Sequence, residues 1–140
     1  MYSVTRVIHF CYGHRLLDYE GKCRHPHGHN GRIEITLLSD KLDGLGMVMD
    51  FEEIKHRVQR WVDETLDHRM LLCKRDPLAA VLRDMGEPVV LMKENPTAEN
   101  IARMIYEHAS QERLPVSSVR LWETANSYAE YGADRDPKRK

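Results

Sequence analysis

Hydrophobic and polar residues alternate along two stretches near the N-terminus, and this period of two predicts two β-strands. Residues 2–12 are rich in β-branched and aromatic types, and His14 would share their apolar face if the strand continued that far. Residues 27–39 alternate more clearly, as expected of a half-buried antiparallel strand. The apolar face of this second strand consists of Ile33, Ile35 and Leu37.

Two later stretches repeat their apolar residues at helical spacing. Asp50 has the position of an N-cap, with Glu53 three residues later as in a capping box, and the helix that follows is expected to run to about Thr65. Residues 97–110 form the second predicted helix. The apolar stripes are Phe51, Ile54, Val58, Trp61 and Val62 in the first helix, and Ile101, Met104, Ile105 and Ala109 in the second.

The rest of the chain contributes shorter elements. Residues 67–87 are less regular, with a helical turn or two around 78–85, and short strands are predicted at 88–92 and 116–123. Residues 125–131 could form another strand. The order of strand, strand, helix, helix, strand, strand predicts an α+β fold, with a four-stranded antiparallel sheet and both helices on one face. The unpaired edges of such a sheet favour oligomerisation through it.

Composition and charge narrow the class of protein. The chain has 140 residues, 41% of them hydrophobic and 31% charged, which is typical of a soluble, globular protein. We expect one domain at residues 1–132 and a disordered tail at 133–140. A net charge of -1 indicates neither a nucleic-acid nor a membrane partner. Three widely spaced cysteines without a signal peptide suit a cytoplasmic protein with reduced thiols.

Four of the eight histidines lie between residues 14 and 29. His27 and His29 are two residues apart, so a strand places both on one face, and His14 ends the neighbouring predicted strand. Gly28 leaves room for a close approach by backbone or ligand. Three neutral imidazoles with a vacant fourth position are what catalytic zinc requires. This spacing makes His14, His27 and His29 candidate ligands of a Zn²⁺ ion.

Ordinary roles for these histidines stay open at this point. Imidazoles also bind other metals and make ordinary hydrogen bonds, and short histidine tracts occur in loops. His25 could ligate or simply lie in the loop, because Pro26 interrupts a regular strand there. The histidines without a clustering partner, which we expect at the core edge or the surface, are His9, His56 and His108.

Cys23 lies four residues before His27, and a thiolate is stabilised beside a bound cation. That position would make Cys23 a base or a nucleophile. The alternative is a buried small hydrophobe, which is the better interpretation for Cys11 and Cys73.

Two acidic residues are further candidates. Asp67 directly precedes His68, and a carboxylate can orient and charge an imidazole, although His68 could instead be a residue favoured by the helix dipole. Glu123 continues the face that carries Val119 and Leu121. A carboxylate there is costly unless it is paired or binds something, and the alternative is an exposed residue at the strand end.

Six segments, in order along residues 10–124, resemble the 6-pyruvoyltetrahydropterin synthase / 6-carboxytetrahydropterin synthase family. They are FCYGHRL (10–16), CRHPHGH (23–29), GMVMDF (46–51), LDH (66–68), PTAEN (96–100) and WET (122–124). The spacing from Cys23 to His27 is similar to that of the bacterial 6-carboxytetrahydropterin synthases, whereas biopterin-forming members typically have a longer gap. Cys11 and Tyr12 depart from the small residues usual before the first histidine of the motif.

The resemblance implies a tunnelling fold (T-fold) of order ββααββ. Its subunits form rings, commonly a homo-hexamer of two stacked trimers with active sites between subunits. It also implies that the three histidines bind zinc and that Cys23 is the catalytic base. Asp67 and His68 would assist Cys23, from the same or a neighbouring subunit. Glu123 would anchor the pterin ring, and Thr97 is a weaker candidate for the same pocket.

The implied activity is that of a zinc-dependent lyase. It converts 7,8-dihydroneopterin triphosphate to 6-carboxy-5,6,7,8-tetrahydropterin with loss of acetaldehyde and triphosphate, a step of queuosine (7-deazaguanine) biosynthesis. Lys22, Arg24 and Arg15 are candidates for holding the triphosphate, and the sequence does not choose among them.

Three alternatives remain open. The first is formation of the pyruvoyl product of the tetrahydrobiopterin type. The second is GTP cyclohydrolase or dihydroneopterin aldolase chemistry, which the His-Gly-His motif together with Cys23 disfavours. The third is a non-catalytic zinc- or pterin-binding protein, in which Cys23 or His25 would close the coordination.

Overall fold

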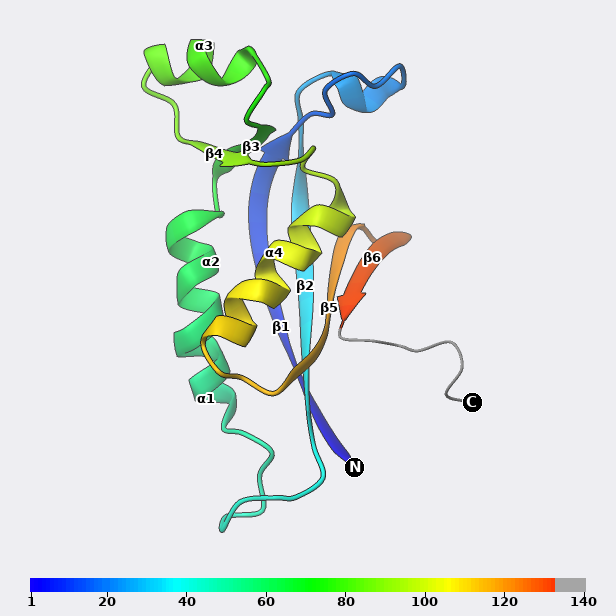
Figure 1. Cartoon of the computed structure of the whole chain (residues 1–140), viewed down its shortest axis with the longest axis vertical. Coiled ribbons are helices and arrows are strands. Elements are labelled where there is room, and N and C mark those ends of the chain that lie inside the picture. Colours follow the sequence, from blue (N-terminus) through cyan, green and yellow to red (C-terminus); the bar gives the residue numbers. More distant parts are fainter. Residues whose placement is uncertain (133–140) are drawn as a thin grey trace.

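Two long strands, β1 (Tyr2–His14) and β2 (His27–Ser39), form the centre of the sheet in the computed structural model, which describes residues 1–132 (Figure 1). They pair antiparallel along their whole length, from Tyr2 opposite Ser39 to His14 opposite His27. Both predicted strands are confirmed, and β1 does continue to His14. The register places three histidines at one end of this strand pair.

The sheet has six strands in the order β4-β3-β1-β2-β5-β6. On one side, β5 (Val116–Thr124) pairs antiparallel with β2, and β6 (Ser127–Gly132) pairs antiparallel with β5. These four strands are the predicted antiparallel sheet. On the other side, β3 (Arg69–Cys73) and β4 (Val89–Met92) widen it by parallel pairing.

Strand β3 falls within the stretch that we predicted to be less regular. Its residues Leu71, Leu72 and Cys73 are all buried, so the strand has an apolar run in place of alternation. This is typical of a parallel strand that is covered on both faces. The predicted strand at 88–92 corresponds to β4.

Both predicted helices are confirmed, and they cover the same face of the sheet (Figure 1). The first consists of α1 (Phe51–Ile54), a π-helical turn at Lys55–Gln59 and α2 (Arg60–Thr65), and the Asp50 carboxylate caps it by accepting from the Glu52 N–H at 2.9 Å. The second, α4 (Ala98–Gln111), is capped by the Thr97 side chain. The short helices are a 3-10 turn at Lys22–Arg24 and α3 (Leu78–Asp84).

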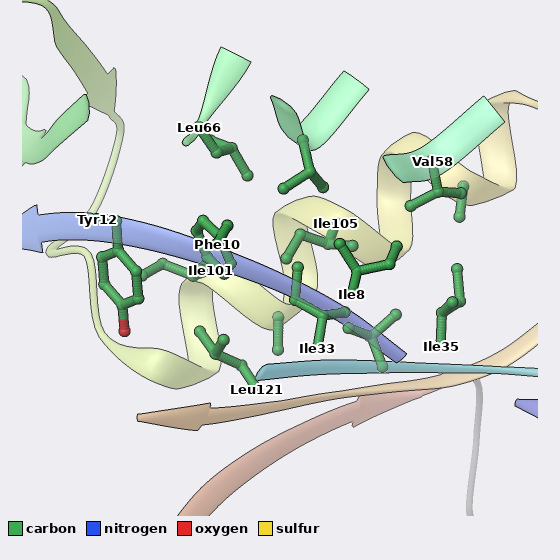
Figure 2. Close-up of a cluster of buried hydrophobic side chains, with 14 of the residues drawn as sticks. Ile8, Phe10, Tyr12, Ile33, Ile35, Val58, Leu66, Ile101, Ile105 and Leu121 are labelled. Atoms are coloured by element: carbon green, nitrogen blue, oxygen red, sulfur yellow. The ribbon is translucent and has the colours of Figure 1, made fainter. Parts of the chain in front are cut away.

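The core lies between the sheet and these two helices (Figure 2). Ile33, Ile35 and Leu37 are fully buried, as their alternation predicted. The expectation for Phe51 is wrong, because its side chain is 48% exposed. The stripe that packs inward instead advances in steps of four residues from Ile54. Such steps drift by about 40° on an ideal α-helix, and the wider π-helical turn counteracts the drift.

Three further features concern the chain as a whole. Within residues 1–132, none of the helices has the length and hydropathy of a membrane-spanning segment. The expected disordered tail at 133–140 lies outside the described residues. The assignment of 1–132 to a single catalytic domain stays a prediction.

Candidate metal centre and its surroundings

Three imidazoles meet at the end of the β1–β2 pair. One ligand atom from each of His14, His27 and His29 lies within 4.8 Å of the others, and this is the potential metal-binding group found among the described residues. The Nε2 atoms of His14 and His29 are 3.1 Å apart. The pairing of β1 with β2 explains the convergence, because His14 lies directly opposite His27 and the alternation places His29 on the same face.

Backbone carbonyls orient two of these rings. The Nδ1–H of His14 donates to the Pro96 carbonyl at 2.7 Å, and the Nδ1–H of His27 donates to the His25 carbonyl at the same distance. Because a carbonyl can only accept, the proton belongs on Nδ1, and Nε2 is left with a lone pair for a metal. His25 thus contributes its backbone, while its ring lies outside the cluster.

This donor set fits zinc. Zinc–nitrogen bonds of about 2.0–2.1 Å in a tetrahedron separate two nitrogens by about 3.3 Å, close to the 3.1 Å between the His14 and His29 atoms. Burial lowers the pKa of His14, and this effect outweighs the hydrogen bond to Pro96 and the nearby Glu123 carboxylate, which favour the charged ring. The neutral imidazole that a metal needs is therefore the stable form.

Glu123, at the end of β5, lies beside the histidines. Its Oε1 is 3.8 Å from His14 Nε2, and its Oε2 is 4.0 Å from His29 Nε2. The Tyr12 hydroxyl donates to Oε1 at 3.4 Å. Burial first, and then the Glu123 charge, raise the pKa of Tyr12, so the phenol stays a donor. Sequence reasoning did not assign Tyr12 to the site, although its departure from the small residues before His14 was a signal.

A glycine in β2 makes room for the Tyr12 ring. A Cβ atom at Gly31 would lie 2.7 Å from Phe10 Cε1 and 3.0 Å from Tyr12 Cε1. The two rings stack with centroids 4.9 Å apart, and Figure 2 shows the Tyr12 hydroxyl directed away from its own strand. Phe10, Tyr12 and Gly31 thus form one packing unit that sets where the Tyr12 hydroxyl meets Glu123.

Cys23 and Thr97 share a cavity with part of the histidine cluster. Both line a cavity of 340 Å³ together with His14 and Glu123. The Thr97 hydroxyl also accepts from the Asn100 N–H at 3.2 Å as the cap of α4. The structure therefore places four of the predicted site residues around one cavity.

Asp67 and His68 lie apart from Cys23, beside the backbone of β1 at Cys11. Asp67 Oδ2 is 2.8 Å from His68 Nδ1, and Asp67 Oδ1 accepts from the Cys11 N–H at 2.8 Å. Burial alone would raise the pKa of Asp67, but these hydrogen bonds and the His68 ring lower it overall. The His68 side chain is 79% exposed and lines a cavity of 630 Å³ that shares no residue with the one lined by Cys23.

The basic residues that are candidates for holding the triphosphate differ in whether they already pair with an acidic side chain. Arg15 donates two hydrogen bonds to the buried Asp76 carboxylate, at 2.7 and 2.5 Å, so its guanidinium already has an anionic partner. Lys22 and Arg24 are exposed in the 3-10 turn. These two remain the better candidates for holding phosphate oxygens.

Comparisons with known proteins bear on this cluster. Residues 3–134 match the family described as 6-pyruvoyl tetrahydropterin synthase. A 6-carboxy-5,6,7,8-tetrahydropterin synthase of Rickettsia conorii is 37% identical over 141 residues, which cover 93% of this chain and 99% of that protein. The protein of the same name from Aquifex aeolicus is 35% identical over 158 residues, covering 93% of this chain and 97% of that one.

Solved structures share the fold. An uncharacterized protein from Wolinella succinogenes has a TM-score of 0.79 and 28% identity, covering 95% of this chain and 98% of that chain. The 6-pyruvoyl tetrahydropterin synthase of Caenorhabditis elegans has a TM-score of 0.72 and 24% identity, covering 95% and 96%. The T-fold inferred from the motifs is confirmed by these likenesses.

Proposed function

This chain belongs to the 6-pyruvoyl tetrahydropterin synthase family, and from that premise we propose that it is a zinc-dependent 6-carboxy-5,6,7,8-tetrahydropterin synthase. Its substrate would be 7,8-dihydroneopterin triphosphate, which with one water gives 6-carboxy-5,6,7,8-tetrahydropterin, acetaldehyde and triphosphate. The curated relatives carry this name, which fits the sequence-based prediction. The reaction would serve queuosine biosynthesis, in a cytoplasmic homo-hexamer.

The observation that carries the proposal is the shared cavity. His14, Cys23 and Glu123 line it, and His27 and His29 converge on His14 from the neighbouring strand. One cavity thus combines the edge of the histidine cluster, a thiol and a carboxylate. A pterin triphosphate requires all three: a group that polarises its side-chain hydroxyls, a base, and an acceptor for its ring N–H groups.

Each residue then has a role. A zinc ion bound by the three histidines would supply Lewis-acid polarisation of the substrate hydroxyls. Glu123 would accept hydrogen bonds from the amino-pyrimidine nitrogens, while Tyr12 holds its Oε1 from the other side. Cys23 would take the proton from the carbon next to the polarised hydroxyl.

Asp67 and His68 would complete the site from a neighbouring subunit. In one chain His68 lines a different cavity from Cys23, and within residues 1–132 the hydrogen bond of the His68 ring is to Asp67. The carboxylate nonetheless fixes the imidazole at 2.8 Å, as a base-orienting group does. Assembly through the edge strands β4 and β6 would bring the exposed ring to the thiol of another copy.

The reaction is tested by product identification. Zinc-loaded protein is incubated with 7,8-dihydroneopterin triphosphate, and the pterin product is identified by mass spectrometry. We expect 6-carboxy-5,6,7,8-tetrahydropterin together with acetaldehyde. A pyruvoyl product would replace this activity with the tetrahydrobiopterin-type one, and a zinc-loaded protein without turnover would support a non-catalytic role.

The shared site is tested by mixing two inactive variants. Cys23→Ala and His68→Ala are each purified, then unfolded, mixed in equal amounts and refolded together. If the thiol and the imidazole come from different subunits, about a quarter of the sites contain both intact groups, and activity returns to about that fraction. Continued inactivity of the mixed oligomer would place both groups in the same chain.

A further inference from the structure

The segment between His14 and Cys23 is held by contacts that the metal site itself does not use. Beyond His14 the chain leaves the sheet and turns at Asp18, whose φ of 59° lies in the left-handed region. The Leu16 N–H donates to the Cys23 carbonyl at 2.8 Å, so the loop closes upon itself. The place of Cys23 therefore depends on how residues 16 and 17 are anchored.

Asn95 provides that anchor. Its Oδ1 accepts from the Leu17 N–H at 2.9 Å, and its Nδ2 donates to the Leu17 carbonyl at 2.9 Å. The side-chain amide thus satisfies both backbone groups of one residue, as a neighbouring strand would. Leu17 directly precedes the left-handed Asp18, a backbone conformation that persists only where the surroundings hold it.

The anchor is itself fixed to the start of α4. The Asn95 carbonyl accepts from the Thr97 N–H at 2.8 Å and from the Asn100 side chain at 2.9 Å. Pro96, the next residue, accepts from His14 at 2.7 Å, and Thr97 lines the cavity. Residues 95–97 therefore contact the Cys23 loop, a candidate metal ligand and the cavity in turn.

We infer that Asn95 is a positioning residue, which holds the Cys23 loop in register with the histidine cluster. Only an amide offers an acceptor and a donor in the spacing of one peptide unit; aspartate or serine would leave one Leu17 group unmatched. The Arg15–Asp76 pair holds the chain one step nearer to His14. Loss of the Asn95 side chain would therefore release the loop beyond Arg15 and leave the histidine cluster in place.

The test compares the reactivity of the three cysteines in one protein. Asn95→Ala and wild-type protein are treated with iodoacetamide, and modification at Cys11, Cys23 and Cys73 is followed separately by mass spectrometry. We expect alkylation of Cys23 to become about tenfold faster, because two hydrogen bonds that oppose local opening are lost. The buried Cys73 should react at an unchanged rate, and zinc content should stay the same.

A matched control separates local release from general destabilisation. Asp50→Ala removes the cap of α1, which lowers the stability of the protein, and it should leave the rate at Cys23 unaltered. The inference is overturned if Cys23 reacts equally fast in wild type and Asn95→Ala, or if Cys23 and Cys73 accelerate together. If Asn95→Ala does not fold, Asn95→Asp carries the same test, because it keeps the acceptor for the Leu17 N–H and loses the donor.

This inference rests on the proposed function only where it makes Cys23 catalytic. On that basis, Asn95→Ala should lower kcat by about tenfold with little change in KM, because the thiol is misplaced while Glu123 and the histidines are not. Full activity of Cys23→Ala would remove the thiol from the mechanism. The alkylation result would still decide whether Asn95 holds the loop.

Discussion

The two halves of the β1–β2 pair show the same alternation of inward and outward side chains, but the inward side chains are apolar in one half and polar in the other. In the half that packs against the helices, the inward positions are aliphatic residues such as Ile8 and Ile33, whose removal from water is favourable by itself. In the other half the inward positions are Tyr12, His14 and His29, which lose hydration and need partners. The histidine cluster is thus a continuation of the core, and carbonyls and anchoring contacts from outside the strand pair hold it in place.

The largest expected effect is at the histidine end. His27→Ala should weaken zinc binding by more than about a hundredfold. Loss of a residue that merely orients a metal ligand lowers metal affinity about 10–100-fold, and here a ligand itself is removed. Metal content and competition with a chelator measure it. His25→Ala is the matched control, since its backbone carbonyl still orients His27. Stoichiometric zinc in His27→Ala would contradict the ligand assignment.

The aliphatic end should respond in stability alone. Ile33→Ala removes a fully buried side chain and should cost about 2–5 kcal/mol in the free energy of unfolding, with Ile33→Val costing about 1 kcal/mol. Urea denaturation measures both. The fraction of protein that stays folded should still bind one zinc ion; loss of zinc in step with stability would mean that the two halves are not separable.

The next largest effect is expected at the Arg15–Asp76 ion pair, which lies just beyond the end of β1. Asp76→Asn should lower stability at neutral pH by about 2 kcal/mol, because it breaks a charge-assisted pair with Arg15. Arg15 lowers the pKa of Asp76 in the folded protein, against the effect of burial.

The pH dependence of that difference follows from the direction of the shift. A carboxyl whose folded pKa is depressed adds stability above its unfolded pKa of about 3.9, and this stability is lost as the pH falls further. The Asn variant does not titrate. Denaturation curves of the two proteins should therefore converge below about pH 4, and a constant gap would rule out the ion pair as its cause.

The smallest effect should come from one hydroxyl at the boundary of the two halves. Tyr12→Phe keeps the ring that stacks on Phe10 and loses the bond to Glu123. Binding of 7,8-dihydroneopterin, followed by fluorescence, should weaken about three- to tenfold, with zinc content unchanged. Tyr106→Phe is the control, because the Tyr106 ring packs against Tyr131 and not against the histidine cluster. Equal affinity in wild type and Tyr12→Phe would show that the hydroxyl does not support Glu123.

The same comparison explains how much the sequence could predict. Alternation placed β1, β2 and β5 and brought the three histidines to one strand end, because a pleat repeats every two residues whatever the side chains are. Strand β3 was not predictable in this way, since it is buried on both faces and does not alternate. The outward position of Phe51 depends on a π-helical turn that the spacing of apolar residues does not announce.

The supporting contacts of the site also lay beyond sequence reasoning. Pro96 and Asn95 act on His14 and Leu17 across 82 and 78 positions of the chain. Such contacts exist only once α4 has packed on the sheet, and no local pattern records them. Glu123 was a candidate because a carboxylate that continues an apolar face is costly without a partner, but its spacing also fitted an exposed residue at the strand end, and its role came from the resemblance.

The central claim is tested most directly by anomalous diffraction at the zinc absorption edge on crystals of the zinc-loaded protein. The account predicts one zinc peak per chain, bonded to Nε2 of His14, His27 and His29, with no fourth ligand from the protein. A peak bonded also to the sulfur of Cys23 or to the His25 ring, or a peak away from these three rings, would contradict it.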